Sequence, residues 1–536
     1  MNARRLWSAI GASAIWFFGT EAFSVSVADP PDQSMIAAST AVADGGNTCA
    51  KCHAAAVAGF ARSKMAQSMR VGGQEPSGVV RIPGTTIRMY SDKNDSWQSL
   101  ESDSVTTTYH VDYVIGSGTH AHGYLINLDH HLFQSPVAYY RSRTAYGMAP
   151  GYEKSASPDF TRPVGEGCVF CHAGSFNAIA GTQNEYGEIP FPHLSIGCNR
   201  CHGDTAAHLA DPDAGNIVNP EYLDTAARDS VCEQCHLIGA ARVLNPGKRF
   251  SDFQAGEPLE DIFTIYRIEA PEGAEARFRV ISHSEQLALS QCKIRSAEKM
   301  WCGTCHDPHN EPTDPVAYYR AKCLQCHAGT AFPAVHPAKT SNCIGCHMPR
   351  RDAQDGGHTA FTDHRIQRTP ETGLASEATS IVPWREPPSN LAKRNLGIAL
   401  IRVGMESKSF KQVAKGYEML TEVQQEFSQD SEMFNALGTA LDLARQYGEA
   451  VQAFQLAVRF DPLSSPKEAS LGQDYEALGD QQQAERHLEK AMELDSLNLS
   501  AAELLISIYE RNGELSKADE LSKKLIRLTR GSMEHK

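Results

Sequence analysis

The chain has 536 residues, which exceeds the size of one ordinary hydrophobic core and predicts two or more domains. Acidic residues outnumber basic ones, 64 to 50, and the sequence has no lysine- or arginine-rich run. This charge balance argues against nucleic acid or an anionic membrane surface as a partner.

The N-terminal segment has the parts of a secretory signal. Basic residues at 4–5 precede an apolar run at 6–18, and Ala28 provides a small residue at the expected cleavage point. The apolar run is shorter than the roughly twenty residues that cross a bilayer, which disfavours the alternative of a membrane anchor. We therefore predict a signal peptide at 1–28 and a periplasmic or cell-envelope protein, soluble after cleavage, with no transmembrane span in the mature chain.

One five-residue pattern, C-x-x-C-H, contains fourteen of the fifteen cysteines. Cysteines in an exported chain normally predict disulfides, but this pattern is the attachment motif for c-type haem. The seven copies are Cys49/Cys52/His53, Cys168/Cys171/His172, Cys198/Cys201/His202, Cys232/Cys235/His236, Cys302/Cys305/His306, Cys323/Cys326/His327 and Cys343/Cys346/His347.

The spacing of the motif has a chemical reason. Two thiols three residues apart on one helical turn can each bond a haem vinyl group, and the adjacent histidine then ligates the iron from the proximal side. A zinc site or a redox dithiol is the alternative for a single copy, but seven copies that all end in histidine favour haem. The sequence thus predicts seven covalently attached haem c groups.

The second axial ligand of each iron decides between electron transfer and catalysis, because an iron with two strong protein ligands does not readily bind substrate. Of 21 histidines, seven are proximal, and His487 and His535 lie in a region without haem motifs. The predicted distal ligands are those closest to the motifs: His193, His208, His283, His309, His336, His358 and His364. Further histidines that could reach an iron are His110, His120, His122, His130 and His131.

The first motif differs, since Met65 and Met69 are the nearest soft ligands after it. A methionine ligand would raise the reduction potential of that haem, so we include Met65 among the distal candidates. The alternative is that both methionines only pack a helix face. Asp129, beside two histidines, and the lone Cys292 are assigned no role.

The motifs divide the chain after the signal. We predict a heptahaem domain at 29–365, with its haems on short helices and loops and forming much of its core. β-Branched and aromatic runs broken by Gly, Asn and Asp predict an inserted β-rich segment at about 78–160. Cysteine then disappears, and residues 366–388 have the composition of a linker.

A helical repeat of 34 residues occupies the C-terminal part of the chain, 389–536. Residues that recur at this offset include Leu437-Gly438 with Leu471-Gly472, Ala450 with Ala484 and Ala518, Asp461 with Asp495, and Gly479 with Gly513. An irregular copy, about seven residues out of register, begins near Asn395. Stacked helix pairs of the tetratricopeptide type form concave surfaces that bind peptides or proteins, although the array could instead only cap the haem domain. The predicted fold class is mainly α, with a cofactor-organised heptahaem domain, its β-rich insertion and an α-solenoid.

The stretches "VDYVIGSGTHAHGYL", "GCNRCHGDTAAH", "WCGTCHDPHN", "CIGCHMPRR" and "FTDHRI" together resemble the exported cytochrome c-552/4 type of multihaem protein with C-terminal tetratricopeptide repeats. The haem portion is also similar to the wider group of pentahaem nitrite reductase and hydroxylamine oxidoreductase. That resemblance implies haems stacked in defined pairs. The chain lacks the lysine-ended motif of the catalytic haem in such nitrite reductases, and none of its tyrosines is marked for a cross-link to haem.

Two functions follow as expectations. The first is an electron carrier, whose seven haems pass electrons in the cell envelope to redox partner proteins docked through the repeats. The alternative is a haem oxidoreductase that acts on a small nitrogen or sulfur compound at one five-coordinate iron. The surplus of histidines favours the first, and the resemblance leaves the second open.

Overall fold

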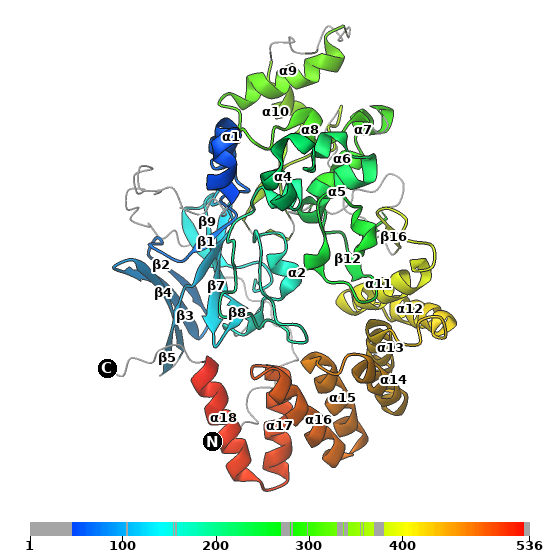
Figure 1. The fold of residues 1–536 in the computed structure, drawn as a ribbon. Coiled ribbons are helices and arrows are strands. Elements are labelled where there is room, and N and C mark those ends of the chain that lie inside the picture. Colours follow the sequence, from blue (N-terminus) through cyan, green and yellow to red (C-terminus); the bar gives the residue numbers. More distant parts are fainter. Residues whose placement is uncertain are drawn as a thin grey trace. The chain divides into compact units, whose positions relative to one another are not determined.

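The computed structural model describes residues 45–102, 105–153, 155, 158–269, 279, 282–296, 299–329, 336, 341–353, 355–356, 358–368 and 380–529. The predicted signal peptide at 1–28 and the central part of the predicted linker lie outside the described residues. Figure 1 shows the order of the elements along the chain.

The β-rich segment consists of antiparallel strands in two sheets. One sheet has the order β2-β3-β4-β5, and the other contains β1, β6, β7, β8 and β11, with β9 joining β7 and β10. Their bounds are β1 Met69–Val71, β2 Gly78–Ile82, β3 Thr85–Asp92, β4 Asp95–Ser102, β5 Val105–His110, β6 Tyr113–Ile115, β7 Ala121–Leu128, β8 His131–Gln134, β9 Val137–Tyr140, β10 Ala145–Met148 and β11 Arg162–Pro163.

Alternation of side chains explains these strands. In β3, the side chains alternate: Ile87 and Met89 are buried, and Arg88 and Tyr90 are exposed, as expected for a strand with one face on a core. Met89 joins Tyr109, Val111, Val114 and other apolar residues in a shared cluster under the two sheets. The predicted β-rich segment therefore corresponds to a real antiparallel unit, which begins slightly earlier, at β1.

Short helices carry the seven cysteine motifs. The helices before the repeats are α1 Gly45–Phe60, α2 Glu166–Val169, α3 Asn199–His202, α4 Ala206–Ala210, α5 Thr225–His236, α6 His283–Ala288, α7 Gln291–Ser296, α8 Cys302–Cys305, α9 Pro315–His327 and α10 Cys343–His347. Short 3₁₀ helices lie at Pro212–Ala214, Pro220–Tyr222, Phe250–Asp252 and Leu259–Asp261.

Two small sheets complete the part before the repeats. One has the order β12-β13-β16, with bounds Ala241–Leu244, Phe263–Ile268 and Ile381–Pro383, and the other pairs β14 (Arg350–Asp352) with β15 (Ala360–Thr362). Strand β16 lies inside the range 366–388 that the composition assigned to a linker. Its pairing with β13 shows that this part of the range belongs to a folded sheet.

The C-terminal part is an array of helix pairs, as the 34-residue period predicts. The helices are α11 Ala392–Glu406, α12 Phe410–Val423, α13 Ser431–Leu443, α14 Tyr447–Phe460, α15 Ser465–Leu478, α16 Gln481–Leu494, α17 Leu499–Arg511 and α18 Leu515–Thr529. A longer connection between α12 and α13 accounts for the irregular register of the first copy.

Glycine at one repeated position lets the two helices of a pair approach closely. A Cβ on Gly438 would lie 2.8 Å from the Phe454 ring, and a Cβ on Gly472 would lie 2.8 Å from Leu488. The Leu-Gly dipeptide of the repeat thus marks helix–helix contact.

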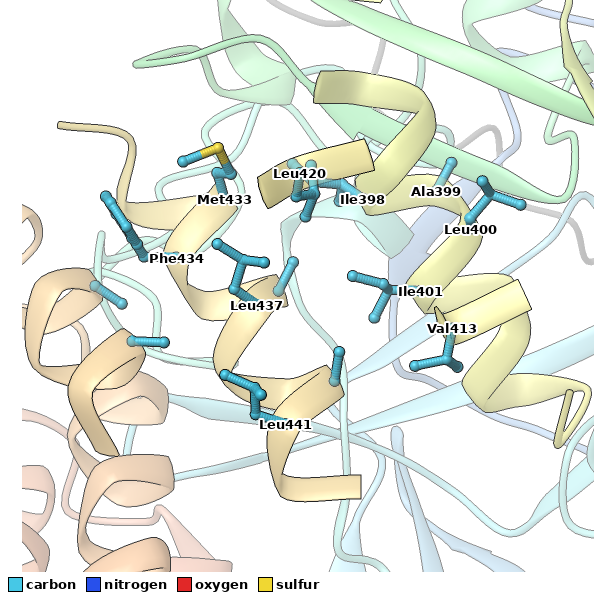
Figure 2. Packing of buried hydrophobic residues seen from close by; sticks show 14 of the residues in the cluster. Ile398, Ala399, Leu400, Ile401, Val413, Leu420, Met433, Phe434, Leu437 and Leu441 are labelled. Atoms are coloured by element: carbon cyan, nitrogen blue, oxygen red, sulfur yellow. The ribbon is translucent and has the colours of Figure 1, made fainter. Parts of the chain in front are cut away.

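The hydrophobic core of the array extends into the small sheet. Ile398, Ile401, Leu420, Met433 and Leu437 pack between α11, α12 and α13, as Figure 2 shows. The same cluster includes Val243 of β12, Tyr266 of β13 and Ile381 of β16. Because α11 completes this core, the array and the sheet fold as one packed unit.

Candidate functional site

Five of the seven motifs have both cysteines within a helix, whereas Cys171 follows α2 and Cys198 caps α3. In α5, α9 and α10 the motif occupies the last turn, and each helix ends at its histidine: His236, His327 or His347. All fifteen cysteines are free thiols in the structure. A C-terminal helical turn provides the i, i+3 spacing that two thioether bonds to one porphyrin require.

Four of the predicted attachment cysteines are exposed. They are Cys52 in α1, Cys168 in α2, Cys326 in α9 and Cys346 in α10, whereas the other ten motif cysteines are half-buried. In α1, α9 and α10 the first cysteine of the motif is half-buried and the second faces solvent, because the chain packs against one side of these helices only. A haem attached through Cys52, Cys326 or Cys346 would therefore lie at the surface of the domain.

Four motif histidines face another histidine, which in three of the four pairs is distant in sequence. Two imidazoles on opposite faces of one metal ion have ring centres about 6 Å apart, since metal–nitrogen bonds are about 2 Å and each nitrogen lies about 1 Å from its ring centre. The observed separations of the ring centres are His53–His208 6.3 Å, His202–His309 5.9 Å, His306–His364 6.2 Å and His347–His336 6.0 Å.

A fifth pair is tighter. The rings of His236 and His283 lie 5.3 Å apart and are nearly perpendicular, at 87°. His283 also lies 4.9 Å from His364, so the pairs of the fourth and fifth motifs are neighbours. Five of the seven predicted distal histidines are therefore beside a motif histidine.

Backbone carbonyls orient several of these rings. Nδ1 of His202 bonds the Val218 carbonyl at 2.7 Å, and Nδ1 of His347 bonds the Gln367 carbonyl at 2.8 Å. Such bonds hold the proton on Nδ1 and leave Nε2 free as a ligand atom. On the fifth motif, the Tyr319 hydroxyl lies 3.1 Å from Nδ1 of His306.

The surroundings of the fourth and fifth motifs favour neutral imidazoles, the form that binds a metal, although the side chains of His236 and His306 reach the surface. Burial, together with neighbouring imidazoles, lowers the pKa of His283 to about 2 and that of His306 to about 4. Burial also lowers the pKa of His236. Among the described residues, Nδ1 of His208 and Nδ1 of His283 are buried without a hydrogen-bond partner. Polar atoms of this kind are rare unless they serve a ligand, so the donor set fits haem iron.

Sulfur contacts connect the motifs to one another. Thiols of different motifs shift one another's pKa: Cys235 lowers that of Cys171, Cys302 raises that of Cys232, and burial together with Cys49 raises that of Cys198. Electrostatic neighbours link Cys201 with Cys232, Cys305 with Cys326, and Cys323 with Cys343. Packing of α3 on α5, of α8 on α9 and of α9 on α10 also makes neighbours of the third and fourth motifs, the fifth and sixth, and the sixth and seventh.

The remaining distal candidates lie elsewhere. His193 is half-buried beside Gly174, and its carbonyl accepts the Gly174 N–H at 3.0 Å. The ring of His358 lies against Tyr140, with ring centres 5.0 Å apart. Met65 is half-buried in the turn after α1, whereas His208 is the ring that faces His53. Met69 is buried in an apolar cluster with Leu125 and other residues.

The second and sixth motifs are outside this set of five histidine pairs. In the described part of the chain, no histidine ring is paired with His172, although burial lowers its pKa as it does for His236. His327 of the sixth motif is exposed at the end of α9.

A cavity of about 290 Å³ adjoins the fourth and fifth histidine pairs. Arg350 Nη2 lies 3.3 Å from Nδ1 of His120, one of the histidines of the β-rich segment. The lining residues are Thr119, His120, His283, Arg350, Phe361, Thr362 and His364. Arg350 was not among the residues predicted for a site, although it lies three residues after His347 of the last motif.

Comparison with known proteins gives limited likeness. No family model and no curated protein matches the chain. Solved structures that are similar to part of it include MamA, at 19% identity over 26% of this chain and 84% of that one, with a TM-score of 0.23. Another is MamA from Desulfovibrio magneticus RS-1, at 18% identity over 26% of this chain and 77% of that one, and its TM-score is also 0.23. A third is the first TPR of Spaghetti bound to an HSP90 peptide, at 16% identity over 22% of this chain and 93% of that one, with a TM-score of 0.20.

Within the residues that the structure describes, no helix combines the length and apolar character needed to cross a membrane.

Proposed function

We propose that the protein is a multihaem c-type cytochrome that carries electrons in the cell envelope. The observation that carries this proposal is the pairing of five motif histidines with histidines from other segments at 5.3–6.3 Å between ring centres. A disulfide or zinc protein would have no need for such imidazole pairs. Haem bound to the motifs would supply reversible one-electron chemistry, and the chain's own residues would set its ligands.

The chain's contacts support a conduit. Packing of α3 on α5 and of α9 on both α8 and α10, together with the mutual pKa effects of cysteines in different motifs, supports a connected series of attachment sites. An imidazole on each side of an iron would exclude substrate from those positions. Cys52 of the first motif and Cys346 of the last are both exposed. Electrons could therefore enter at one of these two motifs and leave at the other.

The histidine pairs are tested by removing one member. In the purified protein with its haems, His208→Ala should convert about one haem in seven from low-spin to high-spin in electron paramagnetic resonance, because His53 would lose its opposite ligand. His358→Ala is the matched control and should leave the spectrum unchanged. A mass equal to the bare chain, or identical spectra for both variants, would contradict the proposal.

The second candidate is an oxidoreductase for a small nitrogen or sulfur compound, and it is favoured by His172, which has no paired ring among the described residues. Cys171 contacts Cys235, so this position would exchange electrons with the series. After reduction, the protein should then bind about one carbon monoxide per chain. Binding of none would leave only the carrier, and binding would lead to assays with nitrite, hydroxylamine and sulfite.

We further infer that the helical array docks a redox partner protein. Apolar side chains at the turns within successive helix pairs are exposed, among them Phe410 at 68% and Leu515 at 65%, with Leu443 and Leu478 less so. Leu478→Lys with Leu515→Lys should slow reduction by a cell-envelope extract but not by dithionite, which needs no docking. Equal rates in the extract would favour a cap rather than a docking surface.

A further inference from the structure

One cluster of metal-ligand side chains lies apart from all seven motifs. Nε2 of His131 lies 2.9 Å from Oδ1 of Asp495 and 3.8 Å from Oε2 of Glu185. All the potential ligand atoms lie within 4.8 Å of one another. The three residues come from the hairpin β7–β8, from the loop after the second motif and from the end of α16.

A tight turn fixes the histidine. Strands β7 and β8 are joined by Asp129 and His130, whose φ angles of 47° and 66° are both left-handed, as in a type I′ hairpin turn. Nδ1 of His131 bonds the Asp129 carbonyl at 2.7 Å. A backbone bond to Nδ1 leaves Nε2 directed at the two carboxylates, which is the arrangement found around metal-binding histidines.

The carboxylates are held in place as well. Asp495 accepts the Gln183 N–H at 3.2 Å on Oδ2 and the Leu497 N–H at 3.1 Å on Oδ1. His131 and Asp495 are each only 1% exposed, whereas the Glu185 side chain is 30% exposed and open to water. Even with a protonated His131, two carboxylates would leave one uncompensated negative charge in a buried site, which is costly.

We propose that His131, Glu185 and Asp495 bind a divalent cation of the zinc class, with water as the fourth ligand. One imidazole nitrogen and two carboxylates suit Zn²⁺ and disfavour Ca²⁺, which takes oxygen ligands. Ligand atoms of a tetrahedral site with bonds of about 2.0–2.2 Å lie roughly 3.4 Å apart. The observed 2.9 and 3.8 Å bracket that spacing.

The cation would have a structural role. Asp495 ends α16, while His131 begins β8, so one ion would join the β-rich segment to the helical array. Asp461 occupies the same position one repeat earlier but pairs with Lys467 at 2.7 Å, without a histidine. The site is therefore specific to one repeat, and its residues are separate from those of the proposed cytochrome function.

The test uses the full chain with its cofactors, equilibrated with Zn²⁺, desalted and analysed for zinc by mass spectrometry. The wild type should retain about one more zinc per chain than His131→Ala or Asp495→Asn. Glu185→Gln should weaken zinc binding at least tenfold, and Asp461→Asn, the matched control, should leave it unchanged. A chelator should lower the melting temperature of the wild type and of Asp461→Asn only.

The competing explanation is an ion pair between His131 and Asp495 without a metal. In that case the partly exposed Glu185 would contribute little to the stability of the site. The Glu185→Gln variant would then have the zinc content and the chelator response of the wild type. That result would overturn the proposal. Because Glu185 is partly exposed, its variant is expected to fold even if His131→Ala or Asp495→Asn does not.

Discussion

Several single residues carry a charge that is buried in the fold and needs a partner of opposite charge. Arg394, 1% exposed, binds Asp430 through two bonds of 2.8 and 3.0 Å and donates to the Leu244 carbonyl at 2.6 Å. Asp430 also caps α13 by accepting the Met433 N–H. One guanidinium therefore joins the first helix of the array to β12 and to the second helix pair.

Removal of this guanidinium should be severe. Arg394→Met is expected to lower the free energy of unfolding by about 3–5 kcal/mol, because Asp430 would remain buried without its partner. Arg402→Met, on the same helix but with a side chain 41% exposed, should cost less than about 1 kcal/mol. Denaturant unfolding of both variants measures the difference, and similar losses would contradict the assignment.

A second residue makes stability depend on pH. Burial, and then the charge and hydrogen bond of Asp442, raise the pKa of Asp474 to about 7. The folded state holds a proton that the unfolded state releases near pH 4, so this group's contribution is full below pH 4 and is lost as the pH rises through 7.

Asp474→Asn should consequently stabilise the protein at pH 8 by about 2 kcal/mol. This is roughly half of the free energy that corresponds to the full pKa shift of Asp474, since Asp442 and Asp474 can move apart. The gain should shrink towards pH 5. Urea unfolding at the two pH values measures it, with the exposed Asp519→Asn as control. A gain that does not change with pH would show that the carboxyl is ionised in the folded state.

At the scale of elements, glycines in the helical array differ in their surroundings: some lie at a close contact between two helices, and others have free space around them. Gly438 allows α13 to contact the Phe454 ring of α14, whereas a Cβ on Gly448, inside α14, would meet no atom within 4 Å. Gly438→Ala should destabilise the array by about 1–3 kcal/mol through overpacking. Gly448→Ala should stabilise it by about 0.5–1 kcal/mol, since alanine is the better helix former. Thermal unfolding followed by circular dichroism measures both, and shifts of the same sign would refute this distinction.

At the scale of the whole molecule, the array shares its core with the small sheet. Ile398 and Val403 of α11 belong to the same apolar cluster as Tyr266 and Ile381. Calorimetry should accordingly show one transition for the repeats and the sheet, and Ile398→Ala should lower it as a unit, at a cost of about 2–5 kcal/mol. Two separate transitions, with only one sensitive to Ile398, would indicate independent domains.

The sequence itself contained the seven C-x-x-C-H motifs, the signals of the antiparallel β-rich segment and the 34-residue period, because each depends on residues close together in the chain or on a short repeat. It also supplied the pool of spare histidines from which the imidazole pairs are drawn. The choice of partners, such as His208 with His53 or His309 with His202, required the tertiary structure, since the paired residues come from segments far apart in the chain. Neither the β16 strand within the linker-like stretch nor the meeting of His131 with Asp495 has a local signature. Both arise from long-range packing, which brings together residues whose spacing in the sequence carries no period.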